Sequence, residues 1–183
     1  MLTRYQSIHR TVLRLEQALD KDMGCVRSII LERSSRDLGI VLVAMESVPV
    51  FTPFSRRYTP KIRKMKTLLL SHLDKVFVEA VVPSNLFDTD KHDLDVNLLS
   101  PILRSYVTME EEVHLCDLYS SRVVAPFLAE TLTKSKLDGG ARNSCNGLEA
   151  VFAAILQFIA AKCSLLLETA QNTAPSLNLL MDG

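Results

Sequence analysis

The chain has 183 residues, of which 48% are hydrophobic and 23% are charged, and its 21 basic and 21 acidic residues give a formal net charge of zero. This composition excludes a disordered chain and a protein that coats nucleic acid over its whole surface. A chain of this length can bury a core without disulfides or metals. We expect a single helical domain over residues 1–175, followed by a flexible tail over residues 176–183.

The cysteines and the apolar segments indicate an intracellular protein. The four cysteines lie far apart and form no Cys-x-x-Cys pair, so we expect reduced, buried thiols and no zinc site. The N-terminus lacks the apolar core of a secretory signal. No apolar run reaches the ~18 residues that indicate a membrane span. We therefore predict a cytoplasmic or nuclear protein without a transmembrane segment.

The first predicted element is an amphipathic helix near the N-terminus. Its apolar residues recur at spacings of three and four, which places them in one stripe on a helix that ends near Gly24. Such a stripe packs inside a bundle or docks on a partner protein. Under the second interpretation the candidate partner-binding residues are Tyr5, Ile8, Val12 and Leu15.

Residues 26–46 allow two interpretations. They contain β-branched residues in two apolar clusters, separated by the polar run Arg33–Asp37. This pattern predicts either a small β-hairpin or two short buried helices. Short apolar runs do not distinguish the two, although helical neighbours on both sides favour helices.

Prolines at positions 49, 53 and 60 mark a connecting segment that contains Phe51 and Phe54, two further candidates for partner binding. Thr59 followed by Pro60 is typical of a helix start. The predicted helix runs to Pro83, and its apolar residues share one face: Ile62, Met65, Leu69, Leu73, Val76, Phe77 and Ala80.

A basic run over residues 56–66 is the most distinctive polar feature, because it contains no acidic residue. It is either a solvated helix start that pairs with the acidic loop at residues 88–95, or a binding site. The ligand would be an acidic protein, or the phosphates of nucleic acid or anionic lipid. The candidate anion-binding residues are Arg56, Arg57, Lys61, Arg63, Lys64 and Lys66.

The second half of the chain is predicted to hold further helices. Ser100 with Pro101 resembles a helix start, and Thr108 with Glu111 matches a capping box. Pro126 is expected to kink or restart the helix that follows.

The last predicted helix, Leu148–Ala170, is apolar on nearly every side, which is typical of a helix surrounded by other protein. We therefore predict a mainly α fold, a helical bundle of about five to six helices around this central C-terminal helix.

Patterns of catalytic and metal-binding residues are missing from the sequence. It has no Gly-x-Ser-x-Gly, no His-Glu-x-x-His and no phosphate-binding glycine loop. We predict no enzyme, no metal and no cofactor. The favoured function is a non-catalytic protein–protein interaction or scaffolding module, a subunit or fragment of a larger multiprotein complex. The alternative is binding of nucleic acid or anionic lipid through residues 56–66. The zero net charge is also compatible with a homo-oligomer.

Overall fold

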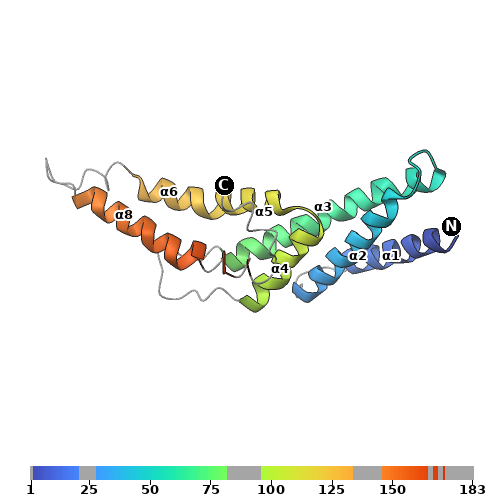
Figure 1. The fold of residues 1–183 in the computed structure, drawn as a ribbon, viewed down its shortest axis with the longest axis horizontal. Helices are drawn as coiled ribbons and strands as arrows, with labels where there is room; N and C mark the ends of the chain where they lie inside the picture. Colours follow the sequence, from blue (N-terminus) through green and yellow to red (C-terminus); the bar gives the residue numbers. More distant parts are fainter. Residues whose placement is uncertain are drawn as a thin grey trace. The chain divides into compact units, whose positions relative to one another are not determined.

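The computed structural model describes residues 2–20, 28–81, 96–133 and 146–164, together with residues 167, 168 and 171. Within these residues all regular structure is helical and no strand occurs, which confirms the predicted mainly α fold (Figure 1). The described helices form six continuous segments: α1 (Leu2–Asp20), α2 (Ser28–Glu46), α3 (Pro53–Val81), α4 (Val96–Thr108), α5 (Glu112–Tyr119) with its continuation α6 (Ala125–Thr131), and α8 (Asn146–Phe158).

The chain divides into two compact units. Unit 1 consists of residues 1–77 and 97–111, and unit 2 consists of residues 78–96 and 112–183. Unit 1 therefore contains α1, α2, α4 and most of α3, whereas unit 2 contains α5, α6 and α8. The single domain over residues 1–175 stays a prediction, and the tail over residues 176–183 lies outside the described residues.

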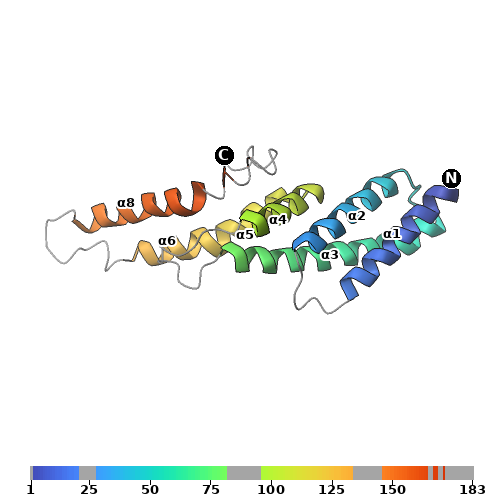
Figure 2. The same ribbon diagram turned by 90° about the horizontal axis from the view of Figure 1, so that it is seen from below.

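Unit 1 is built around α3. The helix α1 packs along the first half of α3, where the Tyr5 and Phe54 rings lie 4.6 Å apart. The helix α4 packs along the second half of α3, where the Phe77 and Tyr106 rings meet edge to face at 6.3 Å (Figure 2). Each helix contributes one apolar face, and these side chains are almost completely buried: Leu15, Leu31, Leu38, Leu69, Leu73, Phe77, Leu99, Ile102, Leu103 and Tyr106.

Residues 28–46 form the single helix α2, so the β-hairpin interpretation is wrong and two short helices are not formed. The polar run Arg33–Asp37 does not interrupt the helix, because its two serines face the core while its arginines face outward. Ser34 and Ser35 are buried, and the Ser35 hydroxyl donates a hydrogen bond to the Leu31 carbonyl oxygen at 2.9 Å. This local bond satisfies a polar group that would otherwise be buried without a partner.

The helix α3 begins at Pro53, so the predicted start at Pro60 is wrong, and Pro60 lies inside the helix. Thr52 is the actual N-cap, since its side-chain oxygen accepts the Ser55 backbone N–H at 3.1 Å and Pro53 follows it. The same threonine–proline signature therefore occurs twice, and the first copy starts the helix. The predicted start at Pro101 is also wrong, because α4 begins at Val96. The predicted apolar face of α3 is confirmed for five residues, which are buried: Ile62, Met65, Leu69, Leu73 and Phe77.

The predicted capping box at Thr108 is wrong, because Thr108 ends α4. Its hydroxyl donates to the Arg104 carbonyl oxygen at 2.8 Å. Beyond it the chain forms a Schellman turn, in which the Glu111 N–H donates to the Tyr106 oxygen at 3.0 Å and the Glu110 N–H to the Val107 oxygen at 3.1 Å. Glu110 holds the left-handed position of this turn, with φ at 57°.

Replacing Glu110 by glycine is expected to stabilise the protein by about 0.5–1 kcal/mol, because glycine adopts positive φ without the steric cost that a side chain incurs. Urea denaturation followed by circular dichroism measures the change. Glu112→Gly is the matched control. It lies in the first turn of α5, where a glycine is expected to destabilise. A loss of stability in Glu110→Gly would contradict the assigned turn.

Unit 2 contains a helical hairpin. In the described residues α6 packs against α8, with the Phe127 and Phe158 rings stacked 4.0 Å apart. A π-helical turn (Ser120–Val124) joins α5 to α6, and Pro126 follows at the start of α6. Val124 and Ala125 keep helical dihedral angles, so the helix continues through Pro126 and the predicted restart there is wrong. A second π-helical turn (Ile159–Cys163) continues α8.

The prediction that the last helix is buried on nearly every side is wrong for its described residues. Val151 and Phe158 are buried, but other apolar residues of α8 are exposed, with exposed fractions of 45% for Leu148, 57% for Phe152 and 66% for Leu156. The hairpin partner covers one face of α8, and these three side chains stay exposed in the described part of unit 2.

Candidate interaction surfaces

The N-terminal stripe lies in the core of unit 1. Ile8, Val12 and Leu15 are each at most 2% exposed. A partner that contacted these three side chains would have to displace α2 or α3, so the stripe serves the fold of unit 1 in this structure.

Tyr5 and Phe54 belong to an aromatic cluster that joins α1 to α3. The rings of Phe54 and Tyr58 are stacked at 4.3 Å, and the Tyr58 hydroxyl lies 2.6 Å from Nδ1 of His9. Both predicted candidates are half-buried by these contacts. Phe51 differs, because it lies on the turn between α2 and α3 and is 86% exposed, next to Val50 at 74%.

The basic run lies on α3, and its six side chains have two kinds of environment. Lys61 contacts Glu16 of α1, with 2.8 Å between nitrogen and oxygen, and Lys66 contacts Glu111 at 2.5 Å. The other four are exposed on the outward side of the helix: Arg56, Arg57, Arg63 and Lys64. The predicted pairing with the loop at residues 88–95 lies outside the described residues.

The zero net charge conceals an uneven distribution between the two units. Unit 1 contains 15 lysines and arginines against 9 aspartates and glutamates, and unit 2 contains 6 against 12. The formal charges are therefore +6 and −6. An excess of this size, of either sign, creates an electrostatic potential at the surface that favours ligands of opposite charge.

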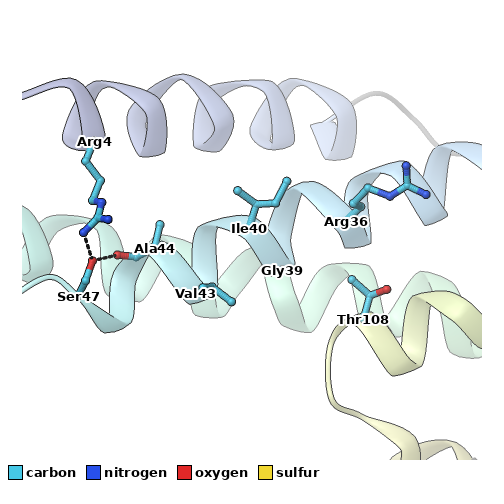
Figure 3. Close-up of a pocket in the computed structure, with 8 residues that line it drawn as sticks. All are labelled: Arg4, Arg36, Gly39, Ile40, Val43, Ala44, Ser47 and Thr108. Atoms are coloured by element: carbon cyan, nitrogen blue, oxygen red, sulfur yellow. Dashed lines mark hydrogen bonds between the residues drawn. The ribbon is translucent and has the colours of Figure 1, made fainter. Parts of the chain in front are cut away.

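An open groove of about 600 Å³ lies on unit 1 along the outer side of α2 (Figure 3). At one end Arg4 of α1 donates a hydrogen bond to the Ser47 hydroxyl at 3.0 Å, and Arg36 lies at the other end. Between them Ile40 and Val43 are 58% and 67% exposed. The remaining lining residues are Gly39, Ala44 and Thr108.

Gly39 allows the end of α4 to approach α2 closely. A Cβ atom at this position would lie 3.1 Å from Cγ2 of Thr108 and 3.2 Å from its carbonyl oxygen. Both distances are tight, so a side chain at this position would shift the end of α4 by a few tenths of an ångström.

The sequence pattern of residues 26–46 does not predict this surface. The residue types of the segment predict buried clusters, but Ile29, Ile40 and Val43 are exposed on α2. Their spacing carries a signal, since α2 has more apolar residues than one helical face can hold. Placed at 3.6 residues per turn, these apolar residues fall on two faces of the helix.

Perturbed ionisable groups in the described residues are explained by packing. Burial, followed by the hydrogen bond to Asp74 at 2.7 Å, raises the pKa of Tyr106 far above its ordinary value. Burial also raises the pKa of Tyr119, which contacts Cys163, and of Cys116. A raised pKa keeps a thiol protonated and makes it a poorer nucleophile.

No group of three or more His, Cys, Asp and Glu within the described ranges is placed to hold a metal ion.

Comparison with known proteins gives one informative similarity. The chain is 23% identical over 175 residues to conserved oligomeric Golgi complex subunit 2 of Arabidopsis thaliana. The alignment covers 94% of this chain but 22% of the plant protein, so the chain spans about a fifth of the length of its relative. No family model and no solved structure matches the chain. No described helix is both long and apolar enough to cross a membrane.

Proposed function

We propose that the protein is a non-catalytic subunit, or part of a subunit, of an oligomeric complex at the Golgi. The observation that carries this proposal is the alignment of nearly the whole chain with a subunit of such a complex. The surfaces of the described helices agree with it, because α2 and α8 each expose an apolar face that a neighbouring protein would cover. The partners would be other subunits of the complex, and the location would be cytoplasmic.

Affinity purification of the tagged full chain from its native cells tests this function. We expect counterparts of the other Golgi complex subunits in near-stoichiometric amounts, and elution at a mass well above the 20.5 kDa of the chain. The matched control is Phe77→Asp, which places a charge in the core of unit 1 and should lose all partners by unfolding. A chain that elutes as a monomer without these subunits would contradict the proposal.

A second candidate function is binding to an anionic lipid surface through residues 56–66. The exposed side chains of Val50 and Phe51 lie on the turn just before Arg56 and Arg57, which are also exposed. An apolar tip flanked by cations favours the interface of an anionic membrane over nucleic acid. Vesicle sedimentation with the same purified chain tests this second function. Arg56→Glu with Arg57→Glu should abolish sedimentation with phosphatidylserine vesicles and leave subunit co-purification unchanged.

A further inference from the structure

The outer face of α2 carries a second helical seam, separate from the face that it buries in unit 1. Its residues recur at spacings of four and three, which are those of the core positions in a coiled coil. All six are exposed, and together we name them the outer seam: Ile29, Arg33, Arg36, Ile40, Val43 and Ser47. Three of them, Ile29, Ile40 and Val43, are aliphatic. Exposed aliphatic side chains on one side of a helix are what a second helix covers when it packs alongside.

The groove gives this seam a definite size. Its lining residues extend from Arg36 on α2 to Ser47, the residue after the end of α2, and at ~1.5 Å per residue this distance is about 16 Å, or three helical turns. In Figure 3 Ile40 and Val43 lie between the two ends of the groove. The groove therefore has room for the side chains of one helix over about three turns.

The charges of the seam select the ligand. Arg33 and Arg36 occupy two consecutive seam positions, and Arg4 borders the groove at its other end. Glu32 contacts Arg36 at 3.5 Å, but it is held more closely by Arg104 at 2.8 Å. The side chain of Arg36 stays 70% exposed, and unit 1 as a whole has a formal charge of +6. Cations at such positions favour a partner with carboxylates opposite them and disfavour a basic partner.

We propose that the outer seam binds an acidic amphipathic helix of a partner protein. Aliphatic side chains of that helix pack on Ile40 and Val43, and its carboxylates pair with Arg36 at one end and Arg4 at the other. This inference rests on the proposed role as a complex subunit and names the surface and the chemistry of the partner. The arginines set the register of the pair, as polar residues at core positions do in coiled coils.

Two synthetic helices and the full chain test the proposal. Both peptides have three heptads with leucine at the core positions, and one has glutamate at the flanking positions where the other has lysine. We expect the glutamate peptide to bind at least about tenfold more tightly by fluorescence anisotropy, a ratio worth about 1.4 kcal/mol. Arg33→Glu combined with Arg36→Glu should reverse the preference, and Val43→Asp should abolish binding of the glutamate peptide. These residues are exposed, so thermal melts of the variants should match the unmutated chain.

Several results would overturn the inference. Equal binding of both peptides would show that the arginines do not select the ligand, and absence of binding would show that the seam is not a docking site. Sedimentation that reveals a dimer broken by Val43→Asp would make a second copy the occupant. These outcomes are independent of the co-purification experiment, since a chain can join the Golgi complex through another surface and leave the outer seam free.

Discussion

Replacing Phe77 by alanine is expected to destabilise the protein by about 3–5 kcal/mol, the cost of removing a large aromatic ring from a packed core. Phe77 is 1% exposed, and its ring packs edge to face against Tyr106 of α4. Truncation would leave a cavity between α3 and α4 and remove this aromatic pair. Urea denaturation followed by far-ultraviolet circular dichroism gives the change in the free energy of unfolding.

The matched control is Phe152→Ala on α8, a substitution of the same chemistry at a side chain that is 57% exposed. We expect its effect to stay below about 1 kcal/mol, because most of the ring is already in contact with water. If Phe152→Ala were the more damaging variant, α8 would be the central helix that its composition indicates, and the described packing would be wrong.

This pair of variants tests the environment of α8, where the sequence-based prediction differs most from the structure. The apolar residues of α8 predict a helix with neighbours on all sides, but burial depends on how many helices surround it. That number is set by tertiary packing and cannot be read from the segment itself. The stripe of α1 was easier to interpret, since Ile8, Val12 and Leu15 have polar residues around them and can bury only one face.

The predicted start of α3 was wrong for a different reason. Thr52–Pro53 and Thr59–Pro60 carry the same local signal, and local chemistry does not say which copy caps the helix. The structure uses the first, so that Tyr58, buried and bonded to His9, belongs to α3 rather than to a connecting segment. The hairpin predicted for residues 26–46 failed similarly, because β-branched residues on an exposed helical face mimic the composition of a strand.

The sequence identifies the candidate binding residues but not the contacts that they make. The basic run was recognised from composition, but the ion pairs of Lys61 with Glu16 and of Lys66 with Glu111 join residues far apart in the sequence. The opposite charges of the two units were hidden for the same reason. Residues 97–111 belong to unit 1 although they follow part of unit 2 in the chain, so no cut at a single position separates the two charges.

Raising the pH from 10 to 12 is expected to destabilise the protein by about 2 kcal/mol through Tyr106 alone. Burial and the hydrogen bond to Asp74 raise the pKa of Tyr106 in the folded state far above the ordinary tyrosine value of 10.0. The contribution of this tyrosine is therefore fully present below pH 10. Above that pH the unfolded chain loses the phenolic proton while the folded chain keeps it, so unfolding becomes more favourable by ~1.4 kcal/mol per pH unit.

Chemical denaturation at pH 8, 10, 11 and 12 measures this dependence, and Tyr106→Phe isolates it from the titration of other groups. The variant should be less stable at pH 8, because the hydrogen bond to Asp74 is lost. Its stability should then fall less steeply above pH 10, so that the two curves converge as the pH rises. Parallel curves would mean that Tyr106 ionises equally well in the folded chain. The hydroxyl would then be accessible to water, contrary to its position at 0% exposure between α3 and α4.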